Sequence, residues 1–310
     1  MNNGCVCCTV RGDLIRIMKK LLKRKNSLDG IIVETTGLAN PGPVIQTFFV
    51  DEEIKEACAL DAVLTVVDAR HVMQHLDEVK PAGVVNEAVQ QIAFADKVLL
   101  NKTDLIQSEE EKAAVRSRIH NINAAAEIIE CQYSNVDLAS LLGISAFSLD
   151  RWLEKDPEFL REEEEAHKHD HGHDHHHHHH EHKAHGEDGH KCDDSCTHGH
   201  THGHKHDDRV TSVGIQMEGE CNMQKLNEWL STLLQVRGPD LFRSKGILAL
   251  QGTDHKHVFQ GVHMILQFSS SKDGAGRPWA SGEKRTNKLV FIGKNLDRNE
   301  LTNSFKACLV

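Results

Sequence analysis

The chain has 310 residues, which is enough for two modest domains with their own cores. Charged residues make up 26% of it, aromatic residues only 5%, and the formal net charge is -10, so a nucleic-acid partner, which needs a basic face, is not expected. No apolar run approaches the roughly 20 residues of a membrane helix, so no membrane partner is expected either. The nine cysteines are too few for a disulfide-dense scaffold. We expect a cytoplasmic protein, with the nucleus as an additional compartment.

The first 155 residues alternate strand-like and helix-like stretches, which predicts an α/β domain with a parallel sheet covered on both faces. Helices are expected where apolar residues recur at helical spacing, over residues 13–25, 86–95 and 108–122. Strands are expected where short apolar runs occur, over residues 30–34, 61–68, 97–101 and 126–130. Three of these strands end in polar residues, Glu34, Asp68 and Asn101. Ligands of such sheets bind at the carboxyl ends of strands.

Residues 161–209 form a low-complexity tract that holds eighteen of the 24 histidines, between His167 and His206. Its few apolar residues cannot offset the entropy of ordering it, so we expect a disordered linker. Imidazole side chains bind divalent ions, which makes the tract a candidate metal reservoir. The alternative is a solvated linker whose histidines have no role.

Residues 210–310 read as a second, smaller α+β domain in the order β-α-β-β-β-α. Strands are expected over residues 211–217, 246–250, 258–268 and 288–293, and helices over residues 223–235 and 298–309. This order predicts a sheet with helices on one face.

Asn101-Lys102-Thr103-Asp104 directly follows an apolar strand. In an N-K-x-D motif the Asn amide bonds the guanine edge, the Lys stem packs over the purine, and the Asp accepts from guanine N1 and N2. Adenine offers no matching pair of donors, so the motif at this place predicts guanine recognition. The alternative is a polar loop after a strand.

Glu34-Thr35-Thr36-Gly37 follows an earlier predicted strand. A carboxylate at a strand end is where P-loop hydrolases hold the water shell of Mg²⁺, and Gly37 lets the backbone approach the γ-phosphate. The alternative is a surface turn. Residues 123–125, before the last strand, are a candidate loop for a backbone N–H donated to the base, and the sequence leaves this undecided.

Cys5, Cys7 and Cys8 lie within four residues, just before a helix expected to start near residues 11–13. The positive end of that helix would favour the thiolate form, and soft sulfur ligands select Zn²⁺ or Cu⁺ over Mg²⁺. Three protein ligands leave one tetrahedral position open, so such a site can pass its metal on. A redox-sensing thiol cluster and inert packing are the alternatives.

Together these motifs, from Asn3-Gly4-Cys5-Val6-Cys7-Cys8 to Asn101-Lys102-Thr103-Asp104, resemble the CobW/HypB/UreG-type metal-chaperone GTPases. The likeness is greatest to the eukaryotic zinc-regulated activators, and residues 210–310 resemble the CobW C-terminal domain. The resemblance implies zinc bound at Cys5, Cys7 and Cys8, guanine contacts from Asn101, Lys102 and Asp104, and a switch carboxylate at Glu34.

One departure from the family pattern is large. The family begins with a strand, a G-x-x-G-x-G-K-[ST] loop and a helix ahead of its cysteine motif, and no stretch of this chain matches that loop. Gly293-Lys294 is followed by Asn295 and lies in the second domain. We therefore expect an N-terminally truncated nucleotide-binding domain with a raw sheet edge and poor triphosphate affinity.

The resemblance implies a zinc metallochaperone that uses GTP and Mg²⁺, converts GTP and water to GDP and phosphate, and loads zinc into a client metalloenzyme. Two alternatives stay open at this point. One is a non-enzymatic zinc buffer that uses the histidine tract, and the other is a GTPase of the same kind that carries cobalt or nickel.

Overall fold

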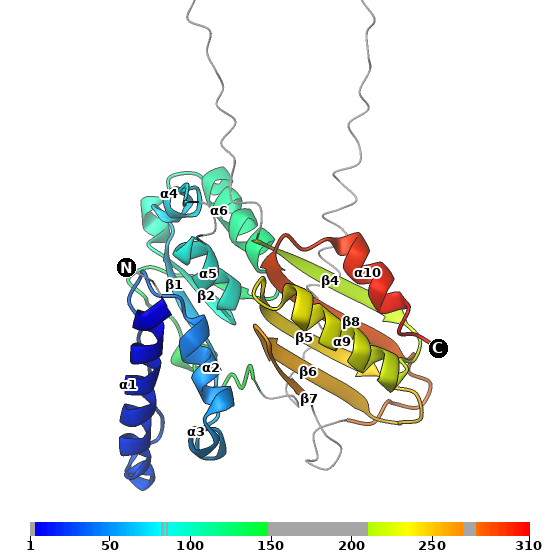
Figure 1. The fold of residues 1–310 in the computed structure, drawn as a ribbon. Coiled ribbons are helices and arrows are strands. Elements are labelled where there is room, and N and C mark those ends of the chain that lie inside the picture. Colours follow the sequence, from blue (N-terminus) through cyan, green and yellow to red (C-terminus); the bar gives the residue numbers. More distant parts are fainter. Residues whose placement is uncertain (1–3, 82–83, 85, 148–209, 269–276) are drawn as a thin grey trace, which may run out of the picture.

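The computed structural model describes residues 4–81, 84, 86–147, 210–268 and 277–310, and of residues 4–10 and 25 only the backbone (Figure 1). The predicted histidine-rich linker lies outside the described residues. The described residues form a parallel three-stranded sheet with its helices and a separate antiparallel five-stranded sheet with two helices. No helix among them is both long and apolar enough to cross a membrane.

The first sheet has the strand order β1-β2-β3, and all its pairs are parallel. Its strands are β1 (Leu64–Asp68), β2 (Lys97–Asn101) and β3 (Glu127–Glu130). Val98, Leu99 and Leu100 of the central strand are buried, as expected of a parallel strand with helices on both faces. The register places Asp68 opposite Asn101, so the polar ends of β1 and β2 lie side by side.

Six helices are described in the first domain, and some of them begin at side-chain caps. They are α1 (Gly4–Leu22), α2 (Gly42–Val50), α3 (Glu52–Ala57), α4 (Val72–Leu76), α5 (Glu87–Phe94) and α6 (Glu109–Ile122), with short 3-10 turns at Lys25–Ser27, Thr103–Leu105 and Leu138–Ser140. Asn86 accepts hydrogen bonds from the N–H groups of Ala88 and Val89, and Ser108 accepts one from the N–H of Glu111. Such caps satisfy backbone donors that have no partner within the helix.

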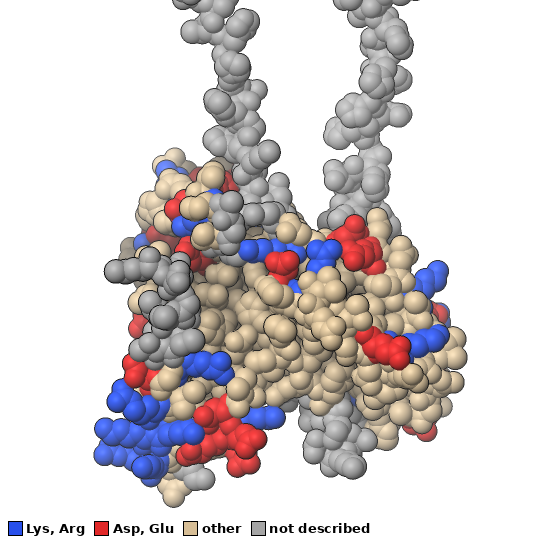
Figure 2. Space-filling model, in the orientation of Figure 1, with Lys and Arg blue, Asp and Glu red and all other residues tan. Residues whose placement is uncertain are grey.

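Basic side chains gather on α1, which carries Lys19 and Lys20 in its last turn, and acidic residues gather beside it on α3 (Figure 2). Lys19 forms ion pairs with Asp51 at 3.2 Å and with Glu53 at 3.0 Å. These pairs attach the carboxyl half of α1 to the start of α3. Cations near a helix C-terminus and anions near a helix N-terminus also interact favourably with the partial charges at those helix ends.

Two expectations for the start of the chain were wrong. The first helix begins at Gly4, so Cys5, Cys7 and Cys8 lie in its first two turns rather than in a turn before it. Residues 30–34 form no strand and are exposed, with Ile32 at 90%. A β-branched run becomes a strand only when a neighbouring strand completes its hydrogen bonds, and among the described residues the sheet ends at β1.

The second sheet has the antiparallel order β4-β8-β5-β6-β7. Its strands are β4 (Val210–Glu218), β5 (Leu241–Ala249), β6 (Lys256–Val262), β7 (Ile265–Phe268) and β8 (Thr286–Lys294). The single strand expected over residues 258–268 is a hairpin, because the chain turns at His263, which has a positive φ of 52°. Helices α9 (Met223–Arg237) and α10 (Arg298–Lys306) cover one face, as expected (Figure 1).

The opposite face of this sheet packs against the first domain. Phe242, Val262 and Ile292 share one core with Ile92 and Phe94 of α5. A second core lies between the sheet and its own helices, where Leu226, Leu230 and Phe305 meet Phe291. The two domains are therefore joined through a continuous apolar core, with the sheet of the second domain between the two helical layers.

Candidate functional site

The N-K-x-D motif lies at the carboxyl end of β2, as the sequence predicts. Asn101 ends the strand, and Lys102 then adopts a left-handed backbone conformation with φ 62° and ψ 34°. Thr103 is buried, and its hydroxyl donates a 3.2 Å hydrogen bond to the carbonyl of Cys131. The chain thus turns sharply at Lys102, and the hydrogen bond of Thr103 holds the loop against the end of β3. Asp104 lies exposed at the end of this turn.

Lys102 is held by a residue of the neighbouring strand. Its Nζ donates a 2.7 Å hydrogen bond to Oδ2 of Asp68, which ends β1. Partial burial of Asp68 alone would raise its pKa, but hydrogen bonds from Lys102, from His71 and from the N–H of Arg70 outweigh this and lower the pKa to about 2. Asp68 is therefore an anion at any pH near neutral. The sequence marks it only by its place at a strand end.

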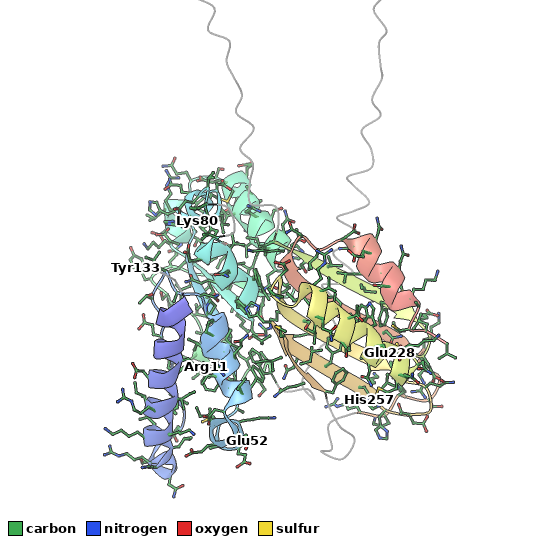
Figure 3. All side chains as sticks on the ribbon, in the orientation of Figure 1. Arg11, Glu52, Lys80, Tyr133, Glu228 and His257 are labelled. Carbon is green, nitrogen blue, oxygen red and sulfur yellow. The ribbon has the colours of Figure 1, made fainter. Side chains whose placement is uncertain are left out.

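Asn101 is held from the other side, by the loop after β3. Its amide donates a 3.0 Å hydrogen bond to the Ser134 hydroxyl, and its Oδ1 accepts a 2.9 Å bond from the Ser134 N–H. Tyr133 and Ser134 both have positive φ angles, 52° and 54°, which is uncommon outside glycine. Tyr133 is 89% exposed and lies at the surface of the domain (Figure 3). No motif in the sequence marks this loop.

The loop at residues 123–125 is not at this edge of the sheet. Asn123 is buried, and its amide donates to the carbonyls of Ile92, Ala93 and Ala95 at 2.8, 3.3 and 2.9 Å. It therefore closes the C-terminal end of α5, where carbonyls lack helical partners. These residues precede β3, whereas the base motif follows β2, so the position of this loop does not favour the base contact that the sequence left undecided.

Glu34 and Gly37 lie in an exposed segment without regular structure. The segment is tied to α5, because the Gln91 amide donates to the carbonyls of Gly37 at 3.1 Å and Ala39 at 3.0 Å. A Cβ added at Gly37 would meet no atom within 4 Å, so the position has open space around it. In the described part of the chain, no hydrogen bond or ion pair links Glu34 to the 101–104 loop.

The three cysteines of the amino-terminal motif lie on one helix, in the first two turns of α1. Among the side chains that the structure describes, no three His, Cys, Asp or Glu residues gather as a metal site. Cys58, Cys131, Cys221 and Cys308 are free thiols, and all but Cys58 are buried. Burial raises the pKa of the Cys221 thiol to about 12, with a further contribution from nearby Cys308, so this thiol is protonated at neutral pH.

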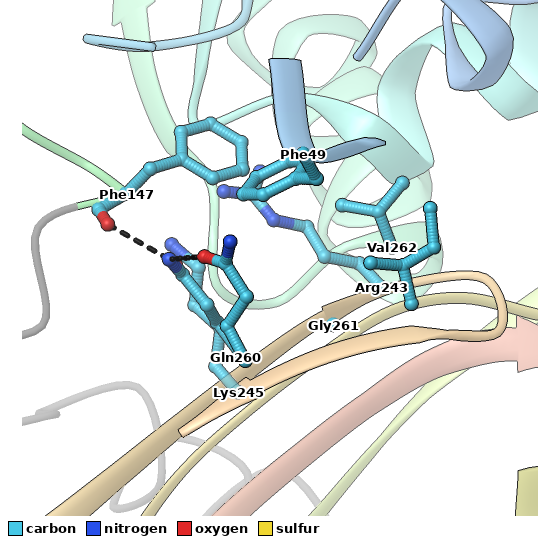
Figure 4. Close-up of a pocket in the computed structure, with 9 residues that line it drawn as sticks. Phe49, Phe147, Arg243, Lys245, Gln260, Gly261 and Val262 are labelled. Carbon is cyan, nitrogen blue, oxygen red and sulfur yellow. Dashed lines mark hydrogen bonds between the residues drawn. The ribbon is translucent and has the colours of Figure 1, made fainter. Parts of the chain in front are cut away.

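A small pocket lies between the domains (Figure 4). Its lining includes Phe49, Phe147, Arg243, Lys245 and Gln260. The Arg243 guanidinium lies 4.6 Å from the centre of the Phe147 ring, and the Gln260 amide donates a 2.8 Å hydrogen bond to the Phe147 carbonyl. The polar side chains of the second domain that line the pocket therefore contact the first domain, and the pocket is part of the domain interface.

A parallel α/β sheet with an N-K-x-D loop at its carboxyl edge defines a guanine-nucleotide-binding class of domain. The comparisons agree. Residues 1–130 match the family model "CobW/HypB/UreG, nucleotide-binding domain", and residues 210–309 match "Cobalamin synthesis protein cobW C-terminal domain". The chain belongs to the CobW/HypB/UreG family.

Similar curated proteins carry names related to zinc. The chain is 31% identical to Zinc-regulated GTPase metalloprotein activator 1 of Schizosaccharomyces pombe, over 96% of this chain and 68% of that protein. It is 27% identical to the zinc chaperone YjiA of Escherichia coli, over 98% of this chain and 80% of that one. It also shares 32% identity with the zinc chaperone CobW of Pseudomonas aeruginosa, over 99% and 74% of the two chains.

A solved structure supports the fold. The crystal structure of Zn(II)-bound YjiA GTPase from E. coli superposes with a TM-score of 0.66 at 23% identity, over 96% of this chain and 76% of that chain. At this level of identity the likeness shows that the two chains share a fold. It agrees with the parallel first sheet and the separate antiparallel second sheet.

Proposed function

We propose that this chain is a guanine-nucleotide-dependent zinc chaperone, which binds zinc at Cys5, Cys7 and Cys8 and delivers it to a client metalloprotein. The observation that carries the nucleotide half of the proposal is the carboxyl edge of the first sheet. There Asp68 holds Lys102, and Ser134 holds Asn101, so that the base-reading motif is fixed from both sides. Family membership and the names of the similar proteins support the zinc half.

The base site works by matching hydrogen-bond donors and acceptors. The Asp104 carboxylate would accept from guanine N1–H and N2–H₂, and the Asn101 amide would bond the guanine edge. The Lys102 stem would lie over the purine ring. Because adenine would leave the Asp104 carboxylate without its two donors in the bound complex, discrimination against adenine is expected.

The zinc ion is the cargo in this proposal. Thiolates suit Zn²⁺, and three of them leave a fourth position at which a client ligand can enter. Because residues two apart on a helix do not face each other, we propose that the first turn of α1 unwinds when Cys5, Cys7 and Cys8 bind one ion. A magnesium ion would be held through water by Glu34, because Mg²⁺ is bound in nucleotide sites by one or two carboxylates together with phosphate oxygens. A single exposed carboxylate fits that pattern. The bound Mg²⁺ would neutralise charge on the phosphates.

The chemical step we propose for the family's nucleotide is hydrolysis of GTP to GDP and phosphate. Glu34 and Gly37 lie on the exposed segment that Gln91 ties to α5. We propose that this segment rearranges when the γ-phosphate is bound and again when it is lost, and that α1 carries the change to the cysteines. Zinc would then pass to the client by ligand exchange.

The experiment measures zinc and cobalt content of the intact chain and of Cys7→Ala. The parent chain is expected to bind Co²⁺ with a thiolate-to-metal charge-transfer band, and Cys7→Ala is expected to lose that band and about one equivalent of zinc. Cys58→Ala is the matched control, because Cys58 is a free thiol outside the motif, and it should keep both.

Three results would contradict the proposal. Equal zinc content and equal cobalt spectra in the parent chain and Cys7→Ala would remove the cysteine site. Several weakly bound ions, unaffected by guanine nucleotide and by Cys7→Ala, would instead favour a zinc buffer based on the histidine tract. A cobalt- or nickel-loading protein would show tighter binding of those ions than of zinc in direct competition.

A further inference from the structure

Both carboxylate oxygens of Asp68 are engaged in hydrogen bonds. Its Oδ1 accepts from the backbone N–H of Arg70 at 3.0 Å and of His71 at 3.3 Å. Its Oδ2 accepts from Lys102 Nζ at 2.7 Å and faces His71 Nδ1 at 3.1 Å. One oxygen therefore fixes the loop after β1, and the other is directed at the N-K-x-D loop of the neighbouring strand.

We infer that Asp68 is a positioning residue for guanine binding, which fixes the Lys102 side chain across the carboxyl edge of the sheet. This inference rests on the proposed nucleotide function. The N-K-x-D motif does not include Asp68, which lies 34 positions before Lys102 in the chain and is brought to it by the β1–β2 register.

Lys102 needs such an anchor because its side chain is long and half exposed. Lysine has four rotatable side-chain bonds, and an unanchored stem would sample many rotamers. The left-handed backbone of Lys102 sets the direction in which its side chain leaves the main chain, and Asp68 fixes the ammonium group at the far end. The stem is thereby held between β2 and β1, which gives the base a preformed apolar platform before it binds.

A carboxylate is required here rather than an amide. Both backbone N–H groups already occupy Oδ1, so an asparagine that kept those bonds would turn its NH₂ group toward the Lys102 ammonium. Two donors would then face each other, and the lysine would be released. Asp68→Asn therefore removes the anchor while keeping the size of the side chain and the bonds that fix its own loop.

The experiment measures GDP binding by the full chain, with saturation-transfer NMR on the guanine H8 proton, which detects weak binding. Asp68→Asn is expected to weaken GDP binding about tenfold, in line with the loss of one charge-assisted contact. The affinity of Asp68→Asn for inosine diphosphate should fall by the same factor, because the Lys102 side chain would pack against either purine ring. Asp68→Glu should recover part of the loss. Glu111→Gln, which removes a nearby exposed carboxylate paired with Arg70, is the matched control and should bind as the parent does.

A double-mutant cycle separates positioning from a structural role. In a Lys102→Met background, Asp68→Asn should have no further effect on GDP binding, because the side chain that Asp68 holds is gone. An equal tenfold loss in both backgrounds would overturn the inference. So would parent-like GDP binding by Asp68→Asn alone, with the nucleotide function left standing. No GDP signal from the parent chain would overturn the proposed nucleotide function and this inference together.

Discussion

Asp96, just before β2, and Arg243, on β5, form an ion pair across the domain interface, and their side chains are only 6% and 5% exposed. Arg243 also donates a 2.8 Å hydrogen bond to the carbonyl of Phe94, the last residue of α5. Lys245 lies 3.2 Å from the same Asp96 oxygen. The pair therefore joins the second domain both to the base of β2 and to the end of a helix of the first domain.

Replacing Arg243 with methionine is expected to lower the free energy of unfolding by about 3–5 kcal/mol, because the Asp96 carboxylate would lose its main partner while staying buried. Urea denaturation of the parent chain and of Arg243→Met measures this. Arg237→Met is the control, since Arg237 pairs with Glu300 on the surface and should cost about 1 kcal/mol or less. Equal effects of the two substitutions would show that the interface pair contributes no more than a surface pair.

The folded chain is also expected to lose stability in mildly acidic solution, because His263 lies at the domain interface and becomes protonated there. Burial lowers the pKa of this histidine, and the hydrogen bond to Leu241, which acts to raise it, does not compensate. Its ring lies edge-on to Phe94 and Phe242, with centroid distances of 5.3 and 5.7 Å. The unfolded chain therefore binds the proton more readily, and stability that is present above about pH 6.5 is lost as the pH falls below it.

The measurement for this window is the unfolding free energy between pH 7.5 and 5. His263→Gln should flatten the decline in that range. The Asp96 pKa is lowered by Arg243 and Lys245 against its own desolvation, so Asp96 contributes stability that is lost only below about pH 3.9. A decline confined to that lower range would contradict a role for His263.

Asp104→Asn is expected to change which purine the chain prefers. In the proposed site the carboxylate would accept from N1–H and N2–H₂ of guanine, whereas the amide of asparagine would offer a donor that suits the 2-oxo group of xanthine. GDP should bind at least about tenfold more weakly and xanthosine diphosphate more tightly. Competition between the two nucleotides, followed by the same NMR signal, tests this. An unchanged order of preference would remove Asp104 from the base site.

Two glycine-to-alanine substitutions should change stability in opposite directions. At Gly246 on β5 an added Cβ would lie 2.1 Å from a Phe259 ring carbon, so a loss of about 1–3 kcal/mol is expected from overpacking. At Gly12 within α1 an added Cβ meets no atom within 4 Å, and alanine should stabilise the helix by about 0.5–1 kcal/mol. Thermal unfolding of both variants measures the two effects. A gain from Gly246→Ala would mean that Phe259 moves aside freely.

The sequence predicts best where a strong local pattern and the tertiary environment agree. Residues 97–101 form β2 as predicted, because an apolar run of that length suits a buried central strand. The N-K-x-D motif follows at the expected edge. Residues 30–34 have an equally strong strand pattern and remain extended coil, since a strand also requires a neighbour.

Partners that are distant in sequence explain most of what the sequence does not show. Nothing local to Asp68 indicates that Lys102 will bind it, and nothing local to Asn101 points to Ser134, since these contacts arise only from the register of three strands. Asn123 shows the converse, because a polar residue that suits a binding loop is used to close a helix whose end comes close only in the folded chain. Registers of this kind are set by long-range packing.

The outer side of β1 has a physical consequence for the protein in solution. Within the described residues β1 is an edge strand, and its Val66 is 61% exposed. An edge of this kind presents free peptide groups that can template pairing with another chain. Concentrated samples are thus expected to self-associate through intermolecular β-structure, and the apparent molar mass from light scattering should increase with concentration even when every thiol is kept reduced.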